Sequence, residues 1–412
     1  MNDLQSRSAF LSEFARRLHL AGVSASRLEG AVRKTASSIG ISCEIWYTPT
    51  GILLSLGDAS NPDVPQQTRV MRVEPASVDL ASLVALDQIA DRVIDGSLSP
   101  AAASKAFRTL DRPPTRRREW TIIFAFGLSA AAVAGLLRTA WLDVAAAGLL
   151  GVLIGALSVY GKRHPPVAEA SEAIGALVVT LLASAFSHFV APLTLQTVVL
   201  AALIVMMPGL ALTTAVGELA SQQLVAGTTR FAGAVVSLLK LTFGSIAGTQ
   251  LAALFGWTGT PRTGVSLAPA IEIVSAFAAA TAFMILFRTK RRDIPLVMAS
   301  ALLGYLITRV TGTWFAEVNT SSLAGGVFFS SLIIAALANL YGRIAKRPGA
   351  LIRLPGIMLM VPGSVGFRGL ALVLQRDYSV GLDTGVAVLN ALVALTAGLL
   401  FGSLVVPPRR YL

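Results

Sequence analysis

Two hydrophobic patterns divide the chain. Up to about residue 111, apolar residues recur at helical spacing, as in Phe10, Phe14 and Leu18, or alternate with polar residues as in strands. From Thr121 onward, apolar residues form runs of roughly 17–25 residues, the length that a bilayer requires. The pattern predicts an α-helical polytopic membrane protein with a small N-terminal α+β domain.

The N-terminal pattern predicts four helices and three strands. Helices are expected over residues 10–20, 24–39, 79–94 and 100–110, and strands over 43–48, 52–56 and 68–73. Ser24, Asp79 and Ser99 can each cap the helix that follows. Pro49, Thr50 and Gly51 are turn residues between the first two strands, so a hairpin is expected there.

The remainder predicts about ten transmembrane helices. Their expected spans are 121–138, 142–160, 170–190, 193–214, 230–256, 267–287, 294–311, 323–341, 351–372 and 383–405. The expected parts of the chain are a domain at 1–111, a basic linker at 112–120, and five-helix repeats at 121–256 and 267–412. An all-soluble protein is excluded, because the intervening loops are short and ten such runs exceed what a soluble core contains.

Basic residues cluster at the ends of the apolar segments. Counted from an N-terminus inside, the loops place sixteen on the inside: Arg112, Arg116, Arg117, Arg118, Lys162, Arg163, Arg230, Arg288, Lys290, Arg291, Arg292, Arg343, Lys346, Arg347, Arg409 and Arg410. Four lie outside: Arg138, Arg262, Arg309 and Arg376. By the positive-inside rule, both termini and the N-terminal domain are expected in the cytoplasm.

An internal repeat relates the two membrane halves. Met206-Met207-Pro208-Gly209 matches Met360-Val361-Pro362-Gly363 at an offset of 154 (362 minus 208). The same offset relates Gly227 to Gly381, Gly244 to Gly398 and Gly248 to Gly402. The last two pairs form a Gly-xxx-Gly in each half, which suits close helix contact.

The repeat length determines its orientation. Five helices per half is an odd number, so the halves are expected to cross the membrane in opposite directions, as in many secondary transporters. The helix count also places the two Pro-Gly elements near opposite faces. Each proline either breaks its helix and leaves half-helix ends that face substrate, or makes an ordinary kink.

Composition narrows the function further. Hydrophobic residues make up 54% of the chain and charged residues 14%, and the net charge is +12. Because the basic residues flank apolar segments, we read them as orientation signals and expect no nucleic-acid partner. Cys43 is the sole cysteine and cannot form an intrachain disulfide. We find no metal-ligand spacing, no nucleotide-binding lysine motif and no nucleophile elbow, so we expect neither a cofactor nor an enzyme.

Several short motifs follow one another along the chain. In the N-terminal part these are Ala21-Gly22, Arg27-Leu28-Glu29, Thr48-Pro49-Thr50-Gly51-Ile52, Thr68-Arg69-Val70 and Asp79-Leu80. In the membrane part they are Pro208-Gly209-Leu210-Ala211-Leu212-Thr213-Thr214, Val361-Pro362-Gly363-Ser364 and Phe367-Arg368-Gly369. In their order and spacing these motifs resemble the threonine/serine exporter family, in the form that fuses both halves in one chain, and the resemblance extends over about residues 10–405.

The resemblance implies export of small hydrophilic metabolites, such as threonine and serine, by antiport with protons. Other members of the family are thought to move dicarboxylates such as succinate, so the substrate stays open. One departure concerns the first-half motif, which usually continues with an Arg-Asp or similar charged pair. This chain has Gly217-Glu218 there, so the carboxylate is kept and the adjacent base is lost.

The candidate transport residues are Pro208, Gly209, Glu218, Lys240, Glu272, Pro362, Gly363, Arg368 and Asn390. Ionisable groups at membrane depth are costly and suggest function. Glu218 and Glu272 are the proton candidates, each with a simple interfacial acid as the alternative. Lys240 lies near the middle of its span and can hold a substrate carboxylate, neutralise Glu218 or snorkel.

Two further residues are weaker candidates for substrate contact. Arg368 can bind a carboxylate bidentately or lie at headgroup level. Asn390 can bind a substrate hydroxyl or amine, or bond to a neighbouring helix.

Two functions from different classes stay open. The first is a proton-coupled exporter of small amino or carboxylic acids in the bacterial inner membrane, with its site between the halves and a homo-oligomer as one arrangement. The second is a membrane-anchored sensor or enzyme whose N-terminal domain is the active part. Ten helices in a repeat exceed what anchoring requires, which favours transport.

Overall fold

A computed structural model describes residues 3–61, 66–74, 77–111, 115–257, 267–317, 322–375 and 377–408. Of the residues used to predict topology, Arg112, Arg262, Arg376, Arg409 and Arg410 lie outside these ranges. The boundaries of the expected domains are not tested by the structure and stay predictions.

Every helix and strand expected before residue 111 has a counterpart. The elements are α1 (Asp3–Leu20), α2 (Ala25–Ser38), β1 (Ile41–Thr48), β2 (Gly51–Asp58), β3 (Gln67–Arg72), α3 (Leu80–Ile94) and α4 (Pro100–Arg108). The strands form an antiparallel sheet in the order β1-β2-β3, and Thr48 pairs with Gly51 across a two-residue turn. Two expected caps are confirmed, since Asp79 accepts from the Ser82 amide and Ser99 from the Ala102 amide. We call these seven elements the N-terminal module.

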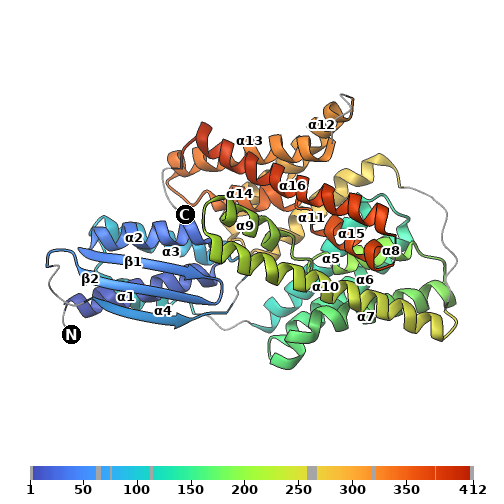
Figure 1. The fold of residues 1–412 in the computed structure, drawn as a ribbon, viewed down its shortest axis with the longest axis horizontal. Helices are drawn as coiled ribbons and strands as arrows, with labels where there is room; N and C mark the ends of the chain where they lie inside the picture. The colour runs from blue at the N-terminus through green and yellow to red at the C-terminus, as the bar shows by residue number, and fades with distance from the viewer. Residues whose placement is uncertain are drawn as a thin grey trace.

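The core of the N-terminal module is continuous with the membrane helices. Phe10, Phe14 and Phe107 stack on one another and are fully buried. The same apolar cluster includes Phe283 and Phe287 of the membrane part. Figure 1 shows the module in blue at one end of the molecule, with the long helices extending away from it.

Within the described residues, nine segments are long and apolar enough to cross a membrane, and one of them, Ala350–Leu374, contains the two helices α14 and α15. The first half contains α5 (Arg116–Leu136), α6 (Trp141–Gly161), α7 (Pro165–Phe189), α8 (Leu195–Leu203), α9 (Gly209–Ala220) and α10 (Leu224–Leu254). The second contains α11 (Pro269–Leu286), a short 3-10 turn (Arg291–Asp293), α12 (Ile294–Glu317), α13 (Ser322–Ala345), α14 (Ala350–Met358), α15 (Gly363–Leu374) and α16 (Tyr378–Val405).

The count differs from ten because the segment expected at 193–214 is not one helix. It consists of two short helices, α8 and α9. The residues that connect them run from Ile204 to Pro208. Proline has no amide hydrogen and its ring clashes with the preceding turn, so the helix stops before it. Pro362 separates α14 from α15 in the same way.

Helices that pack together in the first half have counterparts that pack together in the second. α5 contacts α6, α7 contacts α10, and α9 contacts α10; correspondingly, α11 contacts α12, α13 contacts α16, and α15 contacts α16. The two halves meet where α5 packs on α11. The opposite orientation of the halves is not established by these contacts and stays a prediction.

The glycines of the sequence repeat lie at close helix contacts, as expected. A Cβ on Gly244 would lie 2.1 Å from the Ala173 carbonyl oxygen of α7, and one on Gly248 would lie 2.6 Å from that of Leu177. In the second half, a Cβ on Gly398 would lie 2.4 Å from the Phe328 carbonyl oxygen of α13. Only glycine permits the backbones to approach this closely.

We predict that Gly244→Ala and Gly398→Ala each destabilise the folded protein. The added methyl group has no room beside the facing backbone, and overpacking of this kind costs ~1–3 kcal/mol. A lower midpoint of thermal unfolding in detergent would show it. Gly233→Ala in α10 and Gly385→Ala in α16 are matched controls, because no atom of the described residues lies within 4 Å of their Cβ positions. Equal melting of test and control variants would contradict the close packing.

Candidate functional site

The two Pro-Gly elements contact each other. A Cβ on Gly209 would lie 2.5 Å from Val361 Cγ1 and 3.3 Å from Gly363 Cα, and a Cβ on Gly363 would lie 2.9 Å from Gly209 Cα. The expectation that they lie near opposite faces is therefore wrong. The expectation came from the helix count alone, whereas the structure breaks both segments in their interior: α8 and α9 flank Pro208, and α14 and α15 flank Pro362.

Two helix N-termini are therefore brought together inside the membrane part. α9 begins at Gly209 and α15 begins at Gly363. The first amides of a helix have no partner within it, and the helix dipole gives this end a partial positive charge. The junction thus places polar backbone groups among apolar helices, where one broken helix of each half meets the other.

A cavity of about 250 Å³ leads from this junction to the N-terminal module. Leu210 and Ile357 line it beside the breaks, and Ser24 and Arg27 of α2 line it at the module. α9, α14 and α16 form its walls. Pockets for drug-sized ligands measure about 300–1,000 Å³, so this cavity suits a small metabolite.

Two polar groups in the cavity have no protein partner among the described residues. Burial lowers the pKa of Arg27 to about 10, and no carboxylate of a described residue pairs with its guanidinium. Thr396 is buried, and its Oγ1 makes no hydrogen bond. Arg353 also lines the cavity and uses one nitrogen, Nη2, to donate to Asn339 Oδ1 at 2.8 Å. Guanidinium groups beside a free hydroxyl can bind a carboxylate and a neighbouring hydroxyl.

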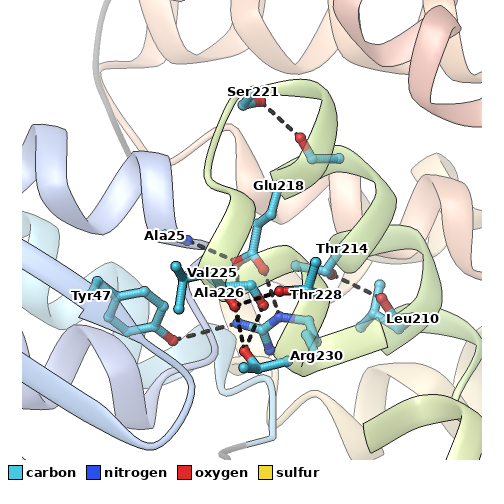
Figure 2. A network of polar contacts seen from close by, with 12 residues as sticks. Ala25, Tyr47, Leu210, Thr214, Glu218, Ser221, Val225, Ala226, Thr228 and Arg230 are labelled. Carbon is cyan, nitrogen blue, oxygen red and sulfur yellow. Dashed lines mark hydrogen bonds and ion pairs between the residues drawn. The ribbon is translucent and has the colours of Figure 1, made fainter. Parts of the chain in front are cut away.

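Glu218 connects the membrane helices to the N-terminal module (Figure 2). Its side chain is 2% exposed and lies at the end of α9. Oε1 accepts from the Ala25 amide at 3.0 Å, at the start of α2, and from Arg230 Nη2 at 3.1 Å. Oε2 accepts from Arg230 Nε at 2.9 Å. Both oxygens are thus occupied, and Arg230 of α10 supplies the base that the Gly217-Glu218 sequence lacks.

The same network extends into the sheet of the module. Arg230 Nη2 donates to the Tyr47 hydroxyl at 3.4 Å, and that hydroxyl lies 2.9 Å from His19 Nδ1. His19 Nε2 lies 2.7 Å from the Glu74 carbonyl oxygen. A carbonyl only accepts, so in neutral His19 the proton is on Nε2, and Nδ1 accepts from Tyr47. Four side chains therefore link α1, β1, α9 and α10.

Four of the expected site residues lie away from this cavity. Lys240 Nζ is 3.6 Å from Glu172 Oε2 and donates to the Glu169 carbonyl oxygen, so it contacts α7 and not Glu218. Glu272 accepts from the Tyr305 hydroxyl and pairs with Arg309 at 2.6 Å. Arg368 and Asn390 are exposed on α15 and α16. The transport roles of the nine expected residues are not tested by these positions and stay predictions.

Sequence reasoning missed three residues: Arg27, Arg230 and Asp143. Arg27 was considered only as part of a family motif, and Arg230 only as a basic residue of a loop. Asp143 lies in the first turn of α6 with no exposed surface. Its Oδ1 accepts from the Thr194 amide at 3.0 Å, while Oδ2 makes no hydrogen bond to any described residue. Asp143 lies just inside an apolar run of the sequence. Because ionisable residues within such runs suggest a functional site, its position was a signal that could have identified it.

We predict that acid weakens the attachment of the module. Burial is the largest influence on His19 and lowers its pKa below the ordinary 6.5; the hydrogen bond to the Glu74 carbonyl opposes this, and Arg230 reinforces it. Unfolded His19 takes up a proton near pH 6.5, which the folded protein resists. Neutral His19 therefore makes its full contribution to the free energy of unfolding above pH 6.5. That contribution is lost as the pH falls through the pKa of His19 in the folded protein.

Unfolding midpoints measured from about pH 8 to about pH 5 test this. His19→Gln should flatten the profile, whereas His164→Gln, at an exposed histidine outside the network, should leave it unchanged. A profile that is equally steep in His19→Gln would contradict the assignment.

Comparison with known proteins covers almost the whole chain. Residues 9–252 match a family model described as "Putative threonine/serine exporter", and residues 272–405 match one described as "Threonine/Serine exporter, ThrE". No solved structure matches the chain.

Curated relatives include several yeast membrane proteins. "Pheromone-regulated membrane protein 10" of Pichia sorbitophila is 25% identical over 84% of this chain and 35% of its own length. The Candida albicans protein of that name is 27% identical over 84% of this chain and 31% of its own. An uncharacterized Schizosaccharomyces pombe protein is 23% identical over 84% of this chain and 46% of its own length. The chain thus spans between about a third and a half of the length of these relatives.

These relatives are from yeasts, so the expected bacterial inner membrane stays a prediction. The two family models account for both halves of the helical part and for most of the N-terminal module. The chain belongs to the threonine/serine exporter family and is a multi-pass membrane protein.

Proposed function

We propose that the protein is a secondary active transporter that exports small hydrophilic metabolites of the threonine and serine type in exchange for protons. The contact between Gly209 and Gly363 carries this proposal. It joins one broken helix from each half, the arrangement in which transporters bind substrate near the middle of the membrane. An anchor for a sensor or enzyme needs no such junction.

The cavity between the junction and the module supplies the substrate-binding groups. Arg27 holds the substrate carboxylate, because it is mostly buried and has no acidic partner among the described residues. The Thr396 hydroxyl bonds to a polar group of the substrate. The helix ends at Gly209 and Gly363 favour the same negative charge.

A small dicarboxylate, such as succinate, is the second candidate substrate. Arg353 and Arg27 both line the cavity, so two carboxylates can each meet a guanidinium. Glu218 is the acid of the cavity wall, and Arg230 and the Ala25 amide occupy both of its oxygens. The ammonium group of an amino-acid substrate would thus bind to hydroxyl and carbonyl oxygens of the cavity and not to Glu218.

Both termini lie in the cytoplasm in this proposal. Arg288, in the loop after α11, pairs with Asp79 of the module at 2.9 Å. Ser221, in the loop after α9, lines the cavity beside Ser24 of the module. The loop after α11, which carries Arg288, Lys290, Arg291 and Arg292, thus adjoins the module, and loops rich in basic residues face the cytoplasm. At the opposite end of the bundle, Arg138 after α5 bonds to Leu267 before α11.

Asp143 is the proton-coupling carboxylate in this proposal. Glu218 pairs with Arg230 and Glu272 with Arg309, whereas Asp143 has no ion pair with any described residue. Asp143 has no exposed surface, and carboxylates buried within membrane-spanning segments recur in the proton relays of transporters. Its hydrogen bond to the Thr194 amide, just before α8, couples it to a broken helix.

Gradient-driven flux tests the transport function. Vesicles containing the protein and a pH gradient should accumulate or release labelled threonine, serine or succinate. Arg27→Gln should raise the half-saturating concentration by roughly 10- to 100-fold, since a hydrogen bond to a charged group contributes ~1.5–3 kcal/mol. Arg33→Gln, at an exposed arginine of the same helix, is the control. Absence of gradient-dependent flux for all three compounds would overturn the proposal.

A second test separates coupling from binding. Asp143→Asn should abolish uphill flux driven by the pH gradient and leave downhill exchange of labelled for unlabelled substrate intact. Glu272→Gln and Glu218→Gln should retain gradient-driven flux, the latter with lower thermal stability. If Glu218→Gln alone loses coupling, Glu218 is the proton carrier and the assignment to Asp143 is wrong.

A further inference from the structure

A basic groove lies at the module end of the bundle, outside the proposed transport site. It has a volume of about 480 Å³ and runs between the start of α5 and the junction of α11 with α12. Arg117 and Arg118 line one side, and Arg288 and Arg291 line the other. The groove therefore bridges the two halves of the membrane part.

The positive charge of this groove exceeds what nearby acids neutralise. Among the described residues, Arg288 pairs with Asp79, while Arg117, Arg118 and Arg291 have no ion pair. The neighbouring acid Glu119 pairs with Arg163 at 2.5 Å. Burial lowers the pKa of nearby Lys162, and the cations Arg288 and Arg118 lower it further. Several like charges thus face one another, which an anion in the groove would stabilise.

The groove also offers an unused hydrogen-bonding group. Thr289 lines it, and Thr289 Oγ1 is buried with no hydrogen-bond partner in the part of the chain that the structure describes. Three arginines that form no ion pair with a described residue, together with this hydroxyl, suit a phosphate group, whose oxygens accept several hydrogen bonds at once.

The apolar wall distinguishes a lipid from a soluble phosphate. Ile122, Met284, Ile285 and Ile294 line the groove beside the arginines. They lie at the ends of candidate membrane spans, where a headgroup meets its acyl chains. We propose that this groove binds one phospholipid with an anionic headgroup, whose phosphate contacts Arg117, Arg118 and Arg291 and whose chains contact the isoleucines.

Lipid titration followed by native mass spectrometry tests the site. Delipidated protein in detergent is mixed with dioleoyl phosphatidylglycerol or dioleoyl phosphatidylcholine. The unsubstituted protein should retain one phosphatidylglycerol in preference to phosphatidylcholine. Arg118→Gln combined with Arg291→Gln should lower that retention roughly tenfold or more, because each basic side chain near an anionic headgroup contributes to binding. Arg288 is left intact, since its loss would unpair Asp79.

Arg16→Gln combined with Arg33→Gln removes the same charge from exposed sites on the module and should retain the lipid. Circular dichroism and gel filtration identify any variant that has not folded, and Arg118→Gln alone then replaces the double variant. Equal retention of phosphatidylglycerol by test and control variants would overturn the proposal. So would its displacement by millimolar inorganic phosphate or glycerol 3-phosphate, since the site would then be one for soluble phosphates.

Discussion

The backbone contact between Gly209 and Gly363 is the constraint on which the membrane architecture depends. The two broken helices approach so closely because neither Gly209 nor Gly363 carries a side chain, and in each half a proline directly precedes the glycine at which the second half-helix begins. The breaks create the paired helix N-termini, and the short half-helices leave room for the cavity toward α2. The Gly-xxx-Gly contacts of α10 and α16 then fix the longer helices around this centre.

The N-terminal module forms part of the cavity wall, not merely an appendage to the bundle. Ser24 and Arg27 reach the cavity because the start of α2 is held by Glu218 through the Ala25 amide. Glu218 is in turn held by Arg230, and Arg230 by Tyr47. Through this series of contacts, the position of the N-terminal module determines which residues line the proposed binding site.

Local patterns made most of the elements predictable. The caps at Asp79 and Ser99, the hairpin at Pro49 and Thr50, and the glycine repeat depend on residues close in sequence or at one offset. The site was less predictable because its contacts join distant segments. Arg230 and Glu218 are twelve positions apart across a turn, and Arg27 meets α9 from nearly two hundred positions away. The break at Pro208 was also hard to place, because α9 continues to Ala220. The hydropathy pattern had ended the expected segment at residue 214.

The module holds one helix from each half. Its α2 is bonded to α9 through Ala25 and Glu218, and the chain entering α3 is bonded to α11 through Asp79 with Arg288 and through the Leu80 amide with the Phe287 carbonyl. A rocking of one half against the other, of the kind that alternating access requires, cannot keep both attachments at their present distances. In the proposed transporter the module would therefore release one half in each cycle or tilt with it, and the strength of its contacts would limit how far the halves can separate.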